Sequence, residues 1–126
     1  LILSPRRIVI IETKNYKGIL EGSVDDIDWK YTKTSAQGNN YTTTVKNPLK
    51  QVKRQTYILS QILKENNINC WIDGYLFLHN AKSYIDSDSI LLNETSLTHK
   101  ITSSGKDNAL RVEDIQRIKE ILKINN

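Results

Sequence analysis

A glutamate and a lysine, Glu12 and Lys14, stand two positions apart directly after the apolar run of residues 8–11. A continuous run of branched apolar residues is typical of a strand buried on both faces. Side chains alternate along a strand, so Glu12 and Lys14 are predicted to project together, about 6.5 Å apart at Cα, while Thr13 points away. Charges at the edge of a core are costly unless they are paired or bind a metal. The pattern is therefore typical of a metal-dependent phosphodiesterase site.

The chemistry of these groups gives each a distinct role. A hard divalent cation such as Mg²⁺ takes oxygen ligands, so the Glu12 carboxylate and the Thr13 backbone carbonyl are the candidate metal ligands. Lys14 cannot bind the metal while protonated, but it can orient the attacking water and offset charge that builds on a phosphate. The alternative is a surface ion pair of little energetic value, because Glu-x-Lys occurs by chance on many strands.

A second cluster of candidate residues follows a predicted helix start at Asn47 and Pro48. Asparagine is a favoured N-cap, and proline is favoured at the first helical position. Gln51 borders the predicted buried stripe and can reach the strand end that carries Glu12 and Lys14. The basic residues of this segment either address a phosphate backbone or form a solvated helix face. These candidate nucleic-acid-binding residues are Lys46, Lys50, Lys53 and Arg54.

Taken in order, the motifs resemble those of the nuclease-related domain, NERD, a family of the PD-(D/E)XK nuclease superfamily. The resemblance is carried by Ile-Glu-Thr-Lys-Asn-Tyr-Lys-Gly at 11–18, by Trp29, and by Asn-Pro-Leu-Lys-Gln at 47–51. It covers the chain from Leu1 to at least Leu78. It implies a restriction-endonuclease-like fold, Mg²⁺ or Mn²⁺ as cofactor, and DNA as partner.

The resemblance also implies roles for individual residues. Glu12 resembles the acidic metal ligand and Lys14 the catalytic lysine, while Gln51 resembles a helix glutamine that positions the lysine or contacts substrate. The superfamily's metal-binding aspartate precedes the Glu-x-Lys strand, and in this family an Asp-His pair stands just before a segment like residues 1–5. No acidic residue precedes Glu12 here. The chain is therefore predicted to be an N-terminally truncated NERD-like domain.

Three acids that follow Glu12 in the chain are candidate substitutes for that aspartate. Asp25, Asp26 and Asp28 crowd a polar segment before Trp29. Aspartate is common in turns because its side chain bonds to nearby backbone groups. A loop role is the commoner one for these three residues.

The rest of the sequence predicts the elements that position the site. Strands, a helix, strands and a helix follow one another, which favours one α/β domain over residues 1–126, with a central mixed β-sheet flanked by helices. The Glu-Thr-Lys strand is predicted to be central, and Asp73-Gly74 to form a bulge or bend. The predicted strands are residues 1–3, 7–14, 19–21, 29–33, 41–45, 70–78 and 89–92; the helices run from 48 to 66–67 and from 110 to 124, after a polar loop at 102–108.

Composition sets broad limits on function. The formal net charge of +4 and the pI of about 9.2 permit a polyanionic partner but do not require one. No apolar run approaches the roughly 20 residues of a membrane helix, and no signal peptide is evident, so a cytoplasmic protein without a membrane partner is expected. Cys70, the only cysteine, fits a reducing interior and is predicted to be a buried, inert thiol.

Three functions follow as hypotheses. The first is a nuclease that hydrolyses DNA phosphodiesters with a divalent metal. The second is a non-catalytic nucleic-acid-binding module on the same fold. The third is a protein-interaction domain in which Glu12 and Lys14 form only a structural ion pair.

Overall fold

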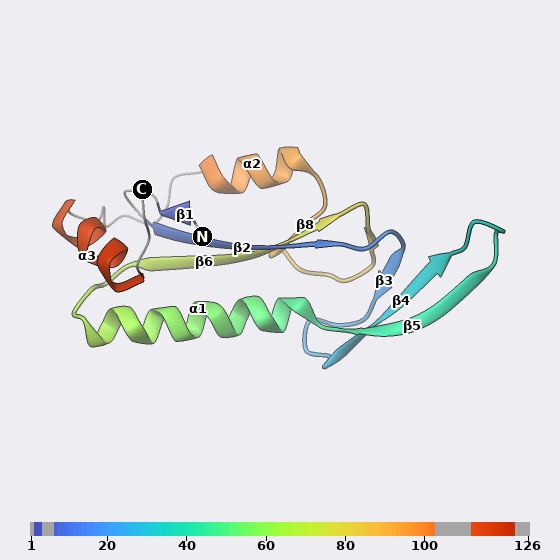
Figure 1. Ribbon diagram of the computed structural model, residues 1–126, viewed down its shortest axis with the longest axis horizontal. Coiled ribbons are helices and arrows are strands. Elements are labelled where there is room, and N and C mark those ends of the chain that lie inside the picture. Colours follow the sequence, from blue (N-terminus) through green and yellow to red (C-terminus); the bar gives the residue numbers. More distant parts are fainter. Residues whose placement is uncertain (1, 4–6, 103–111, 123–126) are drawn as a thin grey trace.

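The computed structural model describes residues 2–3, 7–102 and 112–122. In these residues the chain folds into two four-stranded sheets with three helices (Figure 1). The elements are β1 (Ile2–Leu3), β2 (Arg7–Asn15), β3 (Ile19–Glu21), β4 (Asp28–Thr34), β5 (Asn40–Lys46), α1 (Pro48–Glu65), β6 (Trp71–His79), β7 (Lys82–Ser83), β8 (Ile90–Leu91), α2 (Glu94–Thr102) and α3 (Val112–Leu122).

The first sheet has the strand order β1-β2-β6-β8 and is mixed. β1 is antiparallel to β2, whereas β2, β6 and β8 run parallel. Helix α1 covers one face of this sheet and α2 lies over the other (Figure 1). The predicted α/β class is confirmed, and so is the interior position of the Glu-Thr-Lys strand, β2. The fold is compatible with a restriction-endonuclease-like architecture.

The second sheet was not expected as a separate layer. Its order is β5-β4-β3-β7, and the predicted hairpin is present as β4 and β5, which extend away from the rest of the molecule (Figure 1). β2 and β3 belong to different sheets because the chain turns between them, where the Gly18 amide donates to the Tyr16 carbonyl at 3.0 Å. Leu20 and Trp29 anchor this sheet in the core, since both are fully buried.

Helix α1 packs against both sheets through two apolar clusters. Ile8 and Ile10 of β2 meet Leu59 and Leu63 of the helix in one cluster, which Ile118 of α3 completes. The other cluster joins the beginning of α1 to the second sheet and to the end of β6. Its buried members are Leu20, Trp29, Leu49, Val52, Leu76, Leu78 and Ile85.

The predicted bulge at Asp73-Gly74 is wrong. The β2–β6 ladder is continuous from the Arg7–Trp71 pair to the Asn15–His79 pair, with one residue opposite one residue throughout. Gly74 serves close packing instead, because a Cβ placed on it would lie 2.6 Å from Val52 Cγ1 of α1. The absence of a side chain at Gly74 thus lets α1 pack closely on the first sheet, on the face that carries Glu12.

Replacing Gly74 with alanine is therefore expected to lower the free energy of unfolding by about 1–3 kcal/mol, the usual cost of overpacking a core. Urea denaturation measures this change. The paired variant G74A/V52A tests the cause, because removing the Val52 methyl groups makes room for the new Cβ. The two changes should be non-additive, with the pair costing less than the sum of the single variants. Additive costs would contradict the proposed contact.

A buried ion pair links α2 to the opposite end of the sheet from Glu12. Arg7 is 5% exposed, and its Nη1 donates to Asp73 Oδ2 at 2.5 Å. Trp71 Nε1 donates to Asp73 Oδ1 at 2.7 Å. The Arg7 Nη2 also donates to the carbonyl of Lys100 in the last turn of α2. One guanidinium therefore joins two strands and a helix C-terminus.

Helix α2 was missed by the sequence reasoning. Residues 94–102 contain three threonines and no regular apolar stripe, and their one terminal signal is Asn93, whose Oδ1 accepts from the Ser96 amide at 2.7 Å. The predicted 110–124 helix is present as α3 over the described residues. Of the predicted 102–108 loop, residues 103–108 lie outside the described residues, and Thr102 ends α2. None of the described helices has both the length and the apolar character needed to cross a membrane.

Candidate active site

Glu12 and Lys14 lie side by side on the α1 face of the first sheet, as predicted. The distance from Lys14 Nζ to Glu12 Oε1 is 3.4 Å, and the side chains are 36% exposed for Lys14 and 30% exposed for Glu12. They face the same side as Ile8 and Ile10, because residues alternate along β2. An ion pair this open adds little to stability. Its energetic value therefore does not explain why two charges end a core strand.

The free edge of β2 runs beside this pair. β1 pairs only with Ile8 and Val9, whereas β6 pairs with the whole of β2. From Ile10 onward, β2 has no strand partner on the β1 side among the described residues. Glu12 and Lys14 thus lie at the carboxyl end of a parallel strand, the edge at which open α/β sheets bind ligands.

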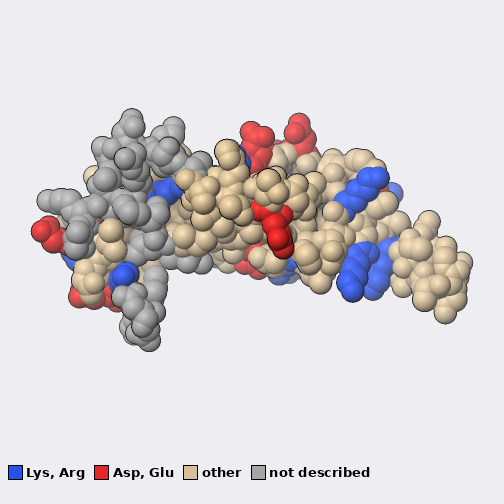
Figure 2. All heavy atoms as spheres, turned by 90° about the horizontal axis from the view of Figure 1, so that it is seen from above, with Lys and Arg blue, Asp and Glu red and all other residues tan. Residues whose placement is uncertain are grey.

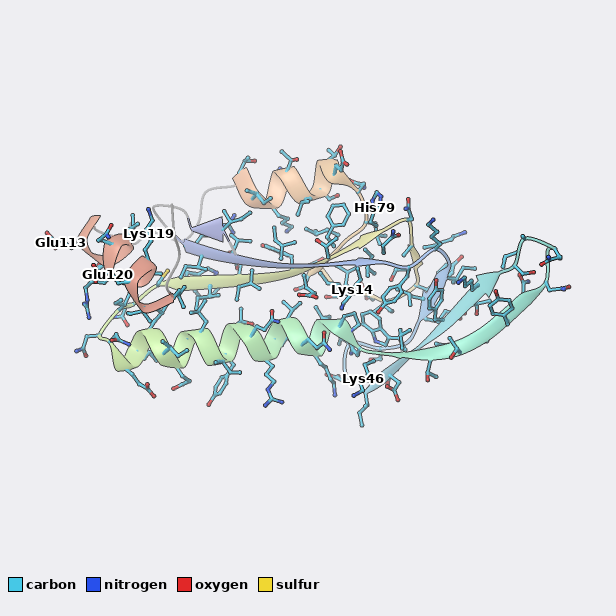
Figure 3. All side chains as sticks on the ribbon, viewed as in Figure 1. Lys14, Lys46, His79, Glu113, Lys119 and Glu120 are labelled. Atoms are coloured by element: carbon cyan, nitrogen blue, oxygen red, sulfur yellow. The ribbon has the colours of Figure 1, made fainter. Side chains whose placement is uncertain are left out.

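The described residues alone do not form a metal centre. No group of three or more His, Cys, Asp or Glu side chains that could hold an ion occurs among the described residues. Glu12 supplies one carboxylate, and Lys14 neutralises it. Two acids of α3, Glu113 and Glu120, lie at the left-hand end of the molecule in Figure 3, whereas Lys14 lies near its middle. Mg²⁺ is typically bound through one or two protein carboxylates together with waters and substrate phosphates, so a second carboxylate besides Glu12 would complete the site.

Of the three aspartates at residues 25–28, Asp26 has a structural partner for its carboxylate. Asp26 Oδ2 accepts from the Ser23 amide at 2.8 Å. The Asp26 carbonyl accepts from Asn47 Nδ2 at 2.8 Å. Asp25 and Asp28 are exposed in the same segment. The loop role expected for this acidic segment fits these contacts.

Asn47 is the N-cap of α1, as predicted, and it also holds this loop. Its Oδ1 accepts from the Leu49 amide at 2.9 Å, while its Nδ2 donates to the carbonyls of Val24 and Asp26. The side chain is nearly fully buried. The amide therefore fixes the start of α1 against the second sheet and sets the position of the helix relative to Lys14.

The structure does not bring the basic residues of α1 to the Glu12–Lys14 pair. At 3.6 residues per turn, Lys50 and Arg54 fall on the opposite side of the helix from Val52 and Leu59, which pack on the sheets. In Figure 3, Lys46 lies below the first turn of α1 and Lys14 lies above it. The basic helix face therefore forms a surface separate from the pair.

The structure does not test the role predicted for Gln51. The residue lies in the first turns of α1 and is exposed. The described contacts include no hydrogen bond from Gln51 to Glu12 or Lys14. A role in positioning Lys14 or in touching substrate stays open to test.

Two exposed lysines, Lys17 and Lys82, follow β2 and β6 in the chain, and the sequence alone did not predict that they meet. Figure 2 shows lysine or arginine side chains gathered next to the projecting hairpin. In the adjoining segments, Lys17 and Lys82 are exposed and neighbouring, because Ile19 pairs with Lys82 and the Lys82 amide donates to the Gly18 carbonyl at 2.9 Å. Lys17 was visible beside the motif, but Lys82 is 65 positions further along the chain. Only the β3–β7 pairing brings the two together.

Cys70 is partly buried rather than fully buried, and it precedes β6. Burial raises the pKa of the Cys70 thiol above its ordinary value of 9.0; the charge of Asp114 adds to the rise, and a backbone hydrogen bond from Ile8 opposes it. The thiolate is the reactive form, so a raised pKa lowers reactivity. The predicted inert thiol agrees with this shift.

Alkylation of Cys70 by iodoacetamide at pH 8 is accordingly expected to be several-fold slower in the folded protein than in urea. Mass spectrometry of the modified fraction over time measures both rates. The raised thiol pKa also makes stability depend on pH. It favours the folded state at pH values below the pKa of the unfolded state, and this contribution to the free energy of unfolding is lost as pH rises through the pKa of the folded state. Equal rates in both states would contradict the raised pKa.

The geometry thus defines a class: an α/β domain whose central parallel strand ends in a glutamate–lysine pair. The family model of the nuclease-related domain, NERD, matches residues 1–79. This match covers more than half of the chain, so the chain belongs to the NERD family and to the PD-(D/E)XK superfamily. It contains Glu12, Lys14 and Gln51, and it ends with β6. Neither a search of curated proteins nor a search of solved structures found a match.

Proposed function

We propose that this protein hydrolyses phosphodiester bonds of DNA with the help of a divalent metal ion, Mg²⁺ or Mn²⁺. The observation that carries the proposal is the Glu12–Lys14 pair at the carboxyl end of β2, 3.4 Å apart and on one face. The pair is too exposed to contribute much stability, so binding and catalysis are the better explanation. The family supports a nuclease-related function and the use of a divalent metal.

Each residue of the pair has a separate task in this proposal. The Glu12 carboxylate and the Thr13 carbonyl would hold the metal, which would supply Lewis-acid activation of water and offset charge on the phosphate. Lys14 holds the attacking water in line and stabilises negative charge on the phosphate oxygens. Its contact with Glu12, at 3.4 Å, holds the ammonium on the same face of β2.

The register of β1 indicates where the missing carboxylate would come from. Ile2 pairs with Val9 and Leu3 with Ile8, so the residue numbers of each pair add up to eleven. If the same register continues, the second residue before Leu1 stands opposite Glu12. Directly opposed residues of antiparallel strands have Cβ atoms about 4.5–5.5 Å apart on the same face. An aspartate at that position, where the family motif has one, would share a metal with Glu12.

The proposal is tested with a form of the protein in which an aspartate stands two positions before Leu1. Supercoiled plasmid and single-stranded DNA are incubated with increasing Mg²⁺ or Mn²⁺, and nicked or shortened products are followed by gel electrophoresis. Cleavage that requires the metal and stops on adding EDTA supports the proposal. The chain that starts at Leu1 is the matched control, and it should cleave far more slowly. Absence of metal-dependent cleavage by the longer protein would refute hydrolysis.

A second candidate function is a non-catalytic nucleic-acid-binding module, which the separate basic face of α1 favours. Lys50, Lys53 and Arg54 are all exposed, and no acidic residue occupies the first turn of α1. Each phosphate contact contributes about 0.9 to the slope of log affinity against log salt concentration. Neutralising the three residues together should therefore reduce that slope by about two to three, measured by fluorescence anisotropy. An unchanged slope would exclude this face as a DNA contact.

A further inference from the structure

A pocket of about 460 Å³ lies on the face of the first sheet opposite Glu12 and Lys14. Thr13 of β2 and His79 of β6 contribute to its lining, because odd-numbered residues of both strands face α2 rather than α1. In Figure 3, His79 lies between the sheet and α2, whereas Lys14 lies on the α1 side. The two sites thus share one strand, and Thr13 stands between the two charged residues in sequence.

The lining of the pocket combines an apolar base with a polar rim. Phe77, which is 6% exposed, and the half-buried Leu97 of α2 supply the apolar surface. The rim holds the exposed side chains of Asn15, His79 and Glu94, which between them both donate and accept hydrogen bonds. Pockets of this size and lining accept small, flat molecules that are apolar on their faces and polar at their edges.

The charge of the rim favours one class of ligand. The Glu94 carboxylate, in the first turn of α2, repels a phosphate but accepts hydrogen bonds from an amino group. Carboxylates recognise the exocyclic amine of cytosine in this way. A nucleobase is flat, stacks on apolar and aromatic side chains, and presents amino and carbonyl groups at its edge. Among parts of a nucleic acid, the base fits this pocket and the phosphate does not.

The two faces of β2 lie close enough for one strand of DNA to touch both. Glu12 and Thr13 are adjacent, and Cα atoms of adjacent residues are about 3.8 Å apart. A strand whose phosphate lies at Glu12 and Lys14 reaches the other face around the carboxyl ends of β2 and β6. Lys17 and Lys82 are exposed there and neutralise the backbone of the strand. The bases on that path then face α2.

We propose that this pocket binds one base of single-stranded DNA beside the phosphate held at Glu12 and Lys14. Bases that carry an exocyclic amino group, above all cytosine, are favoured over thymine, because Glu94 can accept from the amine. This inference rests on the proposed function in one respect: it takes the substrate to be DNA and specifies an unpaired strand. It does not depend on hydrolysis.

Binding without chemistry tests the proposal. Fluorescently labelled oligo-dC and oligo-dT of equal length are titrated with the protein in EDTA, and affinities are obtained from anisotropy. T98W places a large side chain in the pocket. T95W adds the same side chain on the same helix but outside this pocket, so it is the matched control. Circular dichroism verifies that both variants are folded.

T98W is expected to weaken oligo-dC binding by about tenfold, the loss of one stacked base, whereas T95W should bind like the parent protein. E94Q should reduce the preference for oligo-dC over oligo-dT. Equal affinities of T98W and T95W, or no binding of either oligonucleotide by the parent protein, would overturn the pocket. Metal-dependent plasmid cleavage decides hydrolysis separately. Pocket-dependent binding without cleavage would keep this inference and reject the nuclease.

Discussion

Replacing Glu12 with glutamine is expected to reduce metal-dependent DNA cleavage by about 10²–10³-fold, and K14M should have an effect of similar size. Losing one group that stabilises transition-state charge typically costs this much. E12Q keeps the shape of the side chain but removes a charged ligand, and K14M removes the cation while keeping the apolar stem. Initial rates of plasmid nicking, measured in the longer protein at saturating Mg²⁺, give both effects.

The chain provides a matched control for these variants. Glu21 Oε1 of β3 lies 4.0 Å from Lys30 Nζ of β4, in a more exposed ion pair outside the site. E21Q and K30M remove the same charges, and they should leave the rate of nicking unchanged. All four variants should alter the free energy of unfolding by less than about 1 kcal/mol, because open ion pairs contribute little. If E12Q cleaves DNA as fast as E21Q, Glu12 is not a catalytic ligand.

Replacing Arg7 with leucine is expected to lower the free energy of unfolding by about 3–5 kcal/mol, the largest stability effect of any single change proposed for this chain. Arg7 is buried, and its removal leaves the partly buried Asp73 carboxylate without its cation. The last turn of α2 also loses the hydrogen bond from Arg7 to the carbonyl of Lys100. The free energy of unfolding of a native protein is only about 5–15 kcal/mol, so the variant should be mostly unfolded at moderate urea concentrations.

Urea denaturation followed by circular dichroism measures this loss, with K30M as the exposed control. The double variant R7L/D73L separates the cost of a lone buried charge from the value of the pair. Replacing both members of a buried pair by apolar residues is often neutral or stabilising. R7L/D73L should therefore be more stable than R7L. If R7L costs no more than K30M, the guanidinium does not hold α2 on the sheet.

Much of this fold follows from local patterns. The strand with Glu12, the hairpin of β4 and β5, the Asn47 cap and α3 were all predicted, because each depends on residues near one another in the sequence. The bulge predicted at Gly74 was wrong because a glycine in a strand can either mark a bend or leave room for a neighbouring element. A bend is a local feature of the strand. The room that Gly74 leaves for α1 depends on Val52, which lies 22 positions earlier.

Strand alternation alone places Glu12 and Lys14 on one face at the end of β2, and the family motifs give these residues their expected roles. The surroundings of the pair depend on tertiary packing. Helix α1 turns Lys50 and Arg54 away from the pair, strand pairing brings Lys82 to Lys17, and α2 closes a pocket behind Thr13. Those contacts join residues far apart in the chain, and the packing that creates them leaves no periodic trace in the sequence.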